Sequence, residues 1–154
     1  MDVGVIGVGN MGRNHARIYS ELKSVDSLGL FDVNAAAAKA LAEKHGATAY
    51  ATVDELLDHC DAVSVVVPTQ FHAPVVSQVF ARKKSVLIEK PICATSDEAK
   101  ALMKKAPKGI TVGVGHIERF NPIVAEIKKI VKKPLYMEIK RHNPTSARIT
   151  GSSV

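Results

Sequence analysis

The amino-acid sequence predicts an α/β fold in which a doubly wound parallel sheet carries helices on both faces. Apolar strand-like runs alternate with helical segments up to about residue 120, which is the pattern of successive βαβ units. The strand-like runs are continuously apolar and rich in Val and Ala, as expected of strands buried on both faces. A chain of 154 residues is also long enough to form one core of ordinary size.

Local features support the individual elements. Asn34 is a suitable N-cap for an Ala-rich helix. Thr52-x-x-Glu55 and Thr95-x-x-Glu98 are capping boxes, each of which opens a further helix. Strands are expected at residues 3–6, 28–31, 48–51, 62–67, 85–89 and 110–115, with helices between them, in the spatial order 3-2-1-4-5-6 of two βαβαβ halves.

The connection between the first strand and the first helix is rich in glycine. Gly7, Gly9 and Gly12 form a Gly-x-Gly-x-x-Gly pattern, and Asp32 ends the second strand 20 positions after Gly12 (32 − 12). This is the layout of a dinucleotide-binding Rossmann unit, in which the glycines admit a pyrophosphate and the acidic residue binds the ribose diol. Asn10 and Met11 fall within the same predicted loop. The alternative is a glycine-rich turn of some other α/β protein.

The segment from residue 121 onward has a different pattern. Asn121 caps a helix that has Pro122 at its first position, and Pro134 stops this helix. Apolar and polar residues then alternate over 135–139, which predicts a strand with one apolar face. We therefore expect a dinucleotide-binding domain at 1–120. Residues 121–154 are expected to hold a connecting helix with only the opening strand and tail of a second domain.

Charge and composition narrow the classes of partner. Residues 1–81 carry five basic and nine acidic side chains, a net charge of −4; residues 82–154 carry sixteen and six, a net of +10, and the sum is +6. We interpret this asymmetry as solvated helix faces, because no motif that reads RNA or DNA accompanies it. No apolar run is long enough to span a bilayer. The expectation is therefore a protein without a nucleic-acid or membrane partner.

The cysteines and the start of the chain predict a cytoplasmic location. Cys60 and Cys93 are isolated in the sequence, and neither they nor the histidines show a metal-binding spacing, so no metal site is expected. The first strand begins at residue 3, which leaves no space for a signal peptide.

A second group of functional residues follows the fifth strand. In Glu89-Lys90-Pro91 a lysine stands at the carboxyl end of a buried strand, where the proline forces a turn through a bond that can be cis. Such a lysine can donate a hydrogen bond to a substrate hydroxyl or take part in proton transfer. An ordinary surface Glu-Lys pair is the alternative interpretation.

Taken in order, three motifs resemble the cofactor domain of the Gfo/Idh/MocA oxidoreductases, which are NAD(P)-dependent sugar and cyclitol dehydrogenases. The motifs are Gly7-x-Gly9-x-Met11-Gly12-x-x-His15, Pro68-Thr69-x-x-His72 and Glu89-Lys90-Pro91. The resemblance implies that Lys90 is the catalytic residue and that Pro68, Thr69, His72 and Glu89 lie along the cofactor. Asp32, with no arginine at the two following positions, favours NAD over NADP. His15 is expected to be a packed or hydrated helix residue rather than a ligand, and His72 to be either a cofactor contact or simply the start of a helix.

The segment from Gly115 to Pro122 is similar to that of family members that act on UDP-N-acetylhexosamines. This similarity implies a sugar or nucleotide-sugar substrate, with His116 and Arg119 as substrate contacts or, alternatively, as hinge residues. The family's second domain, which supplies further catalytic residues, is not present in this sequence beyond its opening strand.

Three functional hypotheses remain open at this point. In the first, the chain is the NAD-binding half of an oxidoreductase and is inactive alone. In the second, it is a non-catalytic NAD(H)-binding module or subunit. In the third, it is a basic nucleic-acid-binding protein on the same scaffold. The exposed apolar face expected at residues 135–141 also predicts a homo-oligomer that associates through this segment.

Overall fold

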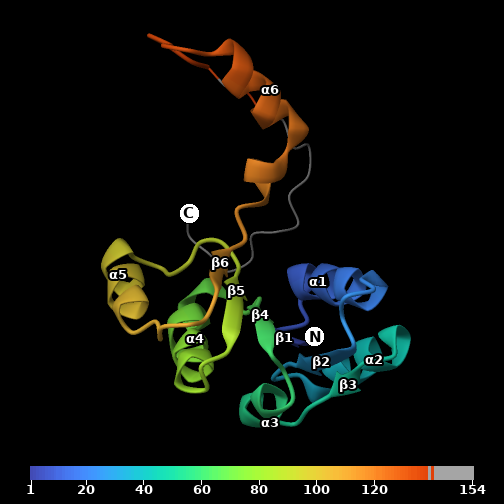
Figure 1. Ribbon diagram of the computed structural model, residues 1–154. Coiled ribbons are helices and arrows are strands. Elements are labelled where there is room, and N and C mark those ends of the chain that lie inside the picture. Colours follow the sequence, from blue (N-terminus) through green and yellow to red (C-terminus); the bar gives the residue numbers. More distant parts are fainter. Residues whose placement is uncertain (139, 141–154) are drawn as a thin grey trace. The chain divides into compact units, whose positions relative to one another are not determined.

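The computed structural model describes residues 1–138 and 140. Within these residues one parallel sheet has the strand order β3-β2-β1-β4-β5-β6, which confirms the predicted fold class and strand order (Figure 1). The strands are β1 (Asp2–Ile6), β2 (Ser27–Phe31), β3 (Thr48–Ala49), β4 (Ala62–Val65), β5 (Ser85–Ile88) and β6 (Val112–Val114). The edge strands β3 and β6 are shorter than predicted, because each has a bonding neighbour on one side only.

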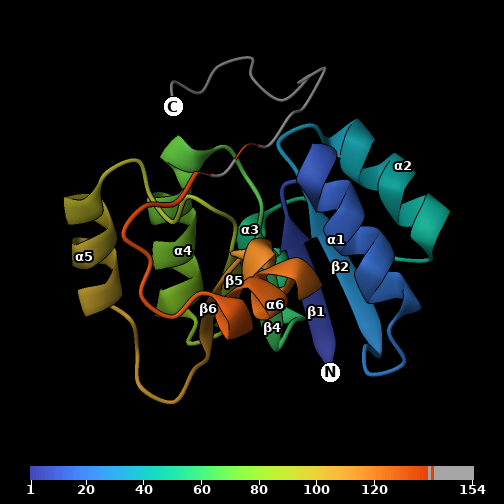
Figure 2. The same cartoon turned by 90° about the horizontal axis from the view of Figure 1, so that it is seen from above.

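Helices connect successive strands and cover both faces of the sheet. They are α1 (Asn10–Glu21), α2 (Ala35–His45), α3 (Val53–Asp58), α4 (His72–Ala81) and α5 (Ser96–Lys104), and a 3-10 turn, η1 (Thr69–Phe71), precedes α4. Helices α1 and α2 lie together beside β1 and β2, whereas α4 and α5 lie beside β5 and β6 (Figures 1 and 2).

The core consists of two apolar clusters, one on each face of the sheet. Successive residues of a strand point to opposite faces, and accordingly Val5 packs in one cluster and Ile6 in the other. The cluster around Val5 includes residues of α1 and α2, and the cluster around Ile6 includes residues of α3, α4 and α5. Both Val5 and Ile6 are fully buried. This division is the packing of a doubly wound sheet and explains why the strand sequences are apolar throughout.

The predicted caps form as hydrogen bonds. Asn34 accepts from the backbone N–H of Ala37 at 3.1 Å. Thr52 and Thr95 accept from the N–H groups of Glu55 and Glu98, at 3.1 and 3.2 Å. Each capping side chain satisfies an N–H that the helix itself leaves without a partner. The starts of α2, α3 and α5 are therefore determined by local sequence.

The structure separates into two compact units, with the first at Met1–Gly115 and the second beginning at His116. The second unit contains a 3-10 turn, η2 (Ile117–Phe120), and helix α6 (Pro122–Ile130). Asn121 connects them: its Oδ1 accepts from the N–H of Ile123 at 3.1 Å, and its Nδ2 donates to Glu118 at 2.9 Å. The domain boundary predicted after residue 120 falls within this second unit, directly after η2, and stays a prediction.

The strand predicted at residues 135–139 is not found in the part of this segment that the structure describes. Residues 135–138 and 140 have no regular structure. The reason is that a strand is stable only beside another strand, and no described strand pairs with this segment. Residues 139 and 141–154 lie outside the described residues, and part of the predicted association segment 135–141 lies there with them.

Candidate functional site

The residues predicted to bind the cofactor and to catalyse the reaction meet at one edge of the sheet. Strands β1, β4 and β5 are adjacent and parallel, and Ile6, Val65 and Ile88 pair in register at their carboxyl ends. The glycine loop follows β1, Pro68 and Thr69 follow β4, and Lys90 follows β5. The carboxyl edge of such a sheet is the place where ligands bind in open α/β folds.

Two of the three loop glycines are required by the fold itself. Gly7 has φ +96°, and a Cβ there would lie 2.7 Å from the carbonyl oxygen of Val66. A Cβ on Gly12 would lie 1.9 Å from the carbonyl oxygen of Gly7, so α1 can approach the loop only without a side chain. These contacts place the start of α1 directly against the end of β1.

Gly9 is different, because nothing in the described structure requires a glycine there. Its φ is −66°, an ordinary value, and a Cβ at this position would have no atom within 4 Å. A side chain would therefore project into open space above the loop. Open space at this position is what the approach of a pyrophosphate to the backbone requires, so the residues present fit a dinucleotide.

The first turn of α1 provides donors for an anion. Gly9 is its N-cap and supplies no side-chain hydrogen bond, and the first turn contains no acidic residue. By contrast, α3 and α5 have threonine caps and two acidic residues each in their first turns. The leading N–H groups of α1, those of Asn10 and Met11 among them, have no acceptor within the helix and lie at its positive end. This arrangement suits phosphate oxygens.

Asp32 is held beside the glycine loop. Its Oδ2 accepts from the N–H of Val8 at 2.7 Å, and its Oδ1 accepts from the N–H of Asn34 at 2.9 Å. The carboxylate thus connects the end of β2 to the loop after β1. A fixed carboxylate at this position can accept hydrogen bonds from a ribose diol and repels a 2′-phosphate.

A partly buried polar network, which the sequence alone did not predict, leads from α1 to Lys90. The Tyr19 hydroxyl lies 2.7 Å from Ser64 Oγ, and Ser64 Oγ lies 3.2 Å from His15 Nδ1. His15 Nε2 lies 3.2 Å from Glu89 Oε1. Glu89 Oε2 in turn accepts from the backbone N–H of Lys90 at 3.1 Å. Both ring nitrogens of His15 thus have a polar contact, with Ser64 and with Glu89.

The carboxylate of Glu89 is held in a confined position. Glu89 as a whole is only 7% exposed. A Cβ on Gly115 would lie 2.8 Å from Glu89 Oε1, so a side chain there would require this carboxylate to shift. Glu89 was predicted to lie along the cofactor, but both of its oxygens are engaged within the protein. Its contact with the cofactor stays a prediction.

Lys90 and His72 occupy contrasting environments at this edge. Lys90 is exposed, and its peptide bond to Pro91 is cis. His72 is 1% exposed, with Nδ1 at 2.9 Å from the Pro91 carbonyl oxygen and Nε2 at 2.8 Å from that of Val67. Both ring nitrogens of His72 lie within hydrogen-bond distance of backbone carbonyl oxygens, and its contact with the cofactor stays a prediction.

The remaining predicted residues lie at the surface. Pro68 is exposed and Thr69 half-buried at the start of η1. His116 and Arg119 are exposed in the second unit, where the N–H of Arg119 donates to the His116 carbonyl at 3.0 Å. Their proposed contact with substrate stays a prediction.

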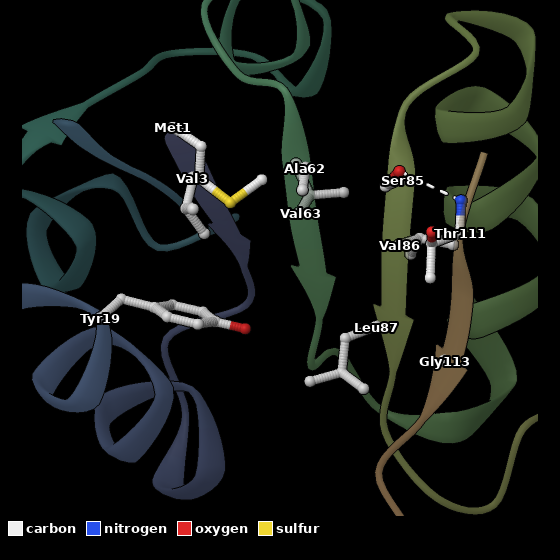
Figure 3. Close-up of a pocket in the computed structure, with 10 residues that line it drawn as sticks. All are labelled: Met1, Val3, Tyr19, Ala62, Val63, Ser85, Val86, Leu87, Thr111 and Gly113. Carbon is white, nitrogen blue, oxygen red and sulfur yellow. Dashed lines mark hydrogen bonds between the residues drawn. The ribbon is translucent and has the colours of Figure 1, made fainter. Parts of the chain in front are cut away.

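A hollow of about 410 Å³ lies on the first unit away from these residues (Figure 3). Its lining is mostly apolar and comes from β1, α1, β4, β5 and the region of β6: Met1, Val3, Tyr19, Ala62, Val63, Ser85, Val86, Leu87, Thr111 and Gly113. Val3, Ala62 and Ser85 pair near the amino ends of their strands. The hollow is therefore distinct from the carboxyl edge that holds the glycine loop and Lys90.

Other site classes have no counterpart in the described part of the chain. No group of three or more His, Cys, Asp or Glu residues could hold a metal ion at residues 1–138 and 140. No helix among the same residues is long and apolar enough to cross a membrane. Cys60 and Cys93 are free and buried, and burial raises the pKa of the Cys60 thiol to about 11.

Comparison with known proteins agrees with the geometry. Residues 1–116 match the Gfo/Idh/MocA model, which describes an oxidoreductase family with an NAD-binding Rossmann fold. The chain is 36% identical over 150 residues to UDP-N-acetylglucosamine 3-dehydrogenase of Acidithiobacillus ferrooxidans, covering 96% of this chain and 47% of that protein. It is 32% identical over 136 residues to inositol 2-dehydrogenase of Corynebacterium glutamicum, covering 84% and 40%.

Solved structures show the same similarity. The A. ferrooxidans enzyme superposes with a TM-score of 0.78 at 37% identity, over 84% of this chain and 41% of that one. The myo-inositol dehydrogenase of Lactobacillus casei, solved with NAD(H) and myo-inositol, superposes with a TM-score of 0.78 at 28% identity, over 84% and 40%. The chain thus spans about half the length, or less, of the relatives that it matches.

Proposed function

Because the chain belongs to the Gfo/Idh/MocA family of oxidoreductases and contains its NAD-binding Rossmann domain, we propose that it is the cofactor-binding half of a sugar or nucleotide-sugar dehydrogenase. The observation that carries this proposal is the common sheet edge shared by the open glycine loop and Lys90. The loop provides a place for NAD, and the lysine provides a polar group beside it.

Lys90 is the residue to which we assign a catalytic role. NAD, when bound, supplies the hydride acceptor for oxidation of an alcohol carbon. Lys90 is exposed and, among the described residues, its side chain makes no hydrogen bond or ion pair. Its Nζ is therefore available to bind the oxygen of a substrate hydroxyl or ketone and to hold or receive the proton there.

The network behind Lys90 supports this assignment. Lys90 presents its side chain from a backbone whose N–H is bound by Glu89, and Glu89 is bound by His15. Reaction rates depend steeply on the placement of the reacting groups. A lysine fixed in this way has a more defined position than a lysine on a freely moving loop.

The substrate class is inferred from the relatives. The similarity to a UDP-N-acetylglucosamine 3-dehydrogenase extends over 96% of this chain, and other relatives are named as inositol 2-dehydrogenases. We therefore place a nucleotide sugar first and a cyclitol second, with His116 and Arg119 as substrate contacts. Both cysteines are free, which supports the cytoplasm as the compartment in which the protein works.

The second candidate is a non-catalytic NAD(H)-binding module or a subunit that needs a partner chain. The matched region is 47% of the first relative, so the rest of that relative has no counterpart among residues 1–154. Under both hypotheses we expect NADH binding and negligible turnover from the 154-residue chain alone. The two hypotheses differ in whether Lys90 takes part in catalysis when a second chain completes the site.

The test is calorimetry of NADH binding, followed by a screen of UDP-sugars and cyclitols that monitors NADH absorbance. Wild type, Lys90→Ala and the exposed control Lys105→Ala should bind NADH equally and show no turnover. Turnover on addition of a second chain that supplies the missing domain, lost in Lys90→Ala alone, would support the dehydrogenase hypothesis. Failure of wild type to bind NADH would refute both, and robust turnover of the chain alone would refute its dependence on a partner.

A further inference from the structure

Strand β6 leaves one edge of the sheet open. Among the described residues, β6 pairs only with β5. The backbone groups of Thr111 and Gly115 form hydrogen bonds with β5, at 2.9 and 2.8 Å. Because these groups alternate in direction along a strand, those of Val112 and Val114 point to the free edge. An extended peptide can therefore continue the sheet at this edge.

The sheet surface beside this edge is hollowed and apolar. Thr111 and Gly113 of β6 line the hollow of about 410 Å³ together with Leu87 of β5 (Figure 3). Among the described residues, Tyr19 is the only helix residue in its lining. Parallel strands are usually covered on both faces, yet Leu87 is only half-buried, whereas Val86, which points to the other face, is buried. A cavity of about 150 Å³ holds a benzene ring, so this hollow has room for about two apolar side chains.

The segment at residues 135–138 lacks a partner in a complementary way. Its apolar and polar residues alternate, but no described strand pairs with it. Side chains two positions apart in an extended segment lie on one side, so Leu135 and Met137 share one side and Tyr136 lies on the other. Leu135 is fully exposed and Met137 is 49% exposed. The segment thus offers free backbone groups and two apolar side chains.

The open edge and the hollow together specify an extended peptide as their occupant. A peptide backbone supplies hydrogen-bond donors and acceptors along a strand edge, and its alternate side chains then fill pockets on one face. No charged side chain of the described residues lines the hollow, which suits apolar side chains rather than phosphates or lipid headgroups. Residues 135–138 have the required backbone, spacing and side chains.

We propose that residues 135–138 of one copy add a strand to the free edge of β6 in a second copy, with Leu135 and Met137 in the hollow. The backbone groups of Val112 and Val114 then bond to the added strand. Each copy carries both the segment and the edge, so two copies complete each other in a closed dimer. Neither contact involves the glycine loop or Lys90, so the dimer is independent of the proposed function.

The contact can be observed directly by NMR of an equal mixture of ¹³C-labelled and unlabelled full chain. Isotope-filtered spectra should show nuclear Overhauser effects between chains, from the methyl groups of Leu135 and Met137 to those of Leu87. Three results would overturn the proposal: a monomeric chain, the same effects only within one chain, or effects between residues 135–138 of one copy and the same residues of the other. This measurement needs no variant.

Substitutions in the segment test which side chains enter the hollow. Leu135→Ser should raise the dissociation constant of the dimer by at least about 10-fold in sedimentation equilibrium, because it removes a large apolar side chain from the contact. Tyr136→Ser is the matched control, since it makes a similar change on the other side of the same segment and should have a much smaller effect. Equal effects of the two substitutions would contradict the placement of Leu135 in the hollow.

A substitution in β6 tests the pairing of backbones. Val112→Pro removes an N–H that points to the free edge and leaves the hydrogen bonds to β5 in place, so it should weaken the dimer by about 10-fold. Val112→Ala shortens the same side chain but keeps the N–H, and it should leave the dimer nearly unchanged. A dimer that tolerates the proline would refute strand addition. If Val112→Pro does not fold in denaturant unfolding, the comparison of Leu135→Ser with Tyr136→Ser still decides the question.

Discussion

Replacing Gly9 with valine should abolish cofactor binding while leaving the protein folded. The Cβ position is empty to 4 Å, and the backbone, at φ −66° and ψ −162°, lies in a region that valine adopts readily. Valine is a poorer N-cap than glycine by about 0.5–1 kcal/mol. Loss of glycine also reduces the entropy of the unfolded chain, which contributes about 0.4–1 kcal/mol in the opposite direction. The free energy of unfolding should therefore change by less than about 1 kcal/mol.

The effect on binding should be much larger. A valine side chain at Gly9 would occupy the space through which the pyrophosphate approaches the first turn of α1. Each charge-assisted hydrogen bond lost to the phosphates costs about 1.5–3 kcal/mol, which corresponds to about 10- to 100-fold in affinity. Since the bulky group displaces the phosphates from several N–H groups at once, we expect a loss of at least about 100-fold.

Calorimetric titration with NADH, together with denaturant unfolding, measures both quantities. The matched controls are Ala101→Val, which adds the same side chain on the exposed face of α5, and Gly12→Ala. Ala101→Val should leave NADH binding unchanged and lower the free energy of unfolding only by the helix-propensity cost of valine, about 0.5–0.7 kcal/mol. Gly12→Ala should unfold or destabilise the protein strongly, because its Cβ would lie 1.9 Å from the Gly7 carbonyl oxygen.

Two results would refute the reasoning. If Gly9→Val binds NADH as tightly as wild type, the open space above the glycine loop is not where the pyrophosphate lies. If Gly9→Val unfolds as Gly12→Ala does, the loop is constrained at Gly9 by contacts other than those found, and loss of binding would then say nothing about the cofactor.

Three further predictions concern the cofactor, the network and the tail. Asp32→Ala should weaken NAD binding by about 10- to 100-fold, since charge-assisted hydrogen bonds contribute about 1.5–3 kcal/mol. Wild type should also prefer NAD to NADP in calorimetric titration, and equal affinities for the two would contradict this role of Asp32. Gly115→Ala should displace the Glu89 carboxylate, because its Cβ would lie 2.8 Å from Oε1, and so lower the free energy of unfolding by about 1–3 kcal/mol. Gly113→Ala is the matched control, because its Cβ would lie 3.3 Å from a Leu87 methyl group. In denaturant unfolding it should lower the free energy of unfolding by less than Gly115→Ala does. Equal losses in the two variants would argue against the network. Finally, the full chain should associate in light scattering at micromolar concentration and a chain ending at Lys133 should not, whereas association of both chains would exclude the tail as the contact.

Much of the fold could be predicted from the sequence, because it depends on features that act over a few residues. The helix starts at Asn34, Thr52 and Thr95 are set by caps that bond within three residues. The continuous apolar runs required strands buried on both faces, and their alternation with helices required parallel pairing. The predicted strand order also implies that the glycine loop and Lys90 lie at one edge of the sheet, because both follow the carboxyl ends of parallel strands.

The strand predicted over residues 135–139 shows where such reasoning fails. Alternation of apolar and polar residues indicates which face of a strand would be buried, but it does not supply the neighbouring strand. Residues 135–138 have no partner among the described strands and no regular structure. The sequence likewise did not reveal the partners of His15 and His72. His15 contacts Glu89, 74 positions away, and His72 contacts Pro91, 19 positions away.

The sequence by itself therefore determined the doubly wound sheet, the dinucleotide loop and the position of Lys90, since periodicity, capping and glycine spacing are local properties. Only the tertiary structure decided what holds Lys90 in place. His15 comes from α1, Glu89 from the end of β5 and Gly115 from the end of β6, and they meet because parallel strands bring distant segments to one edge. Contacts of this kind form between side chains far apart in the chain and are made or lost by shifts of a few tenths of an ångström, about which sequence spacing carries no information.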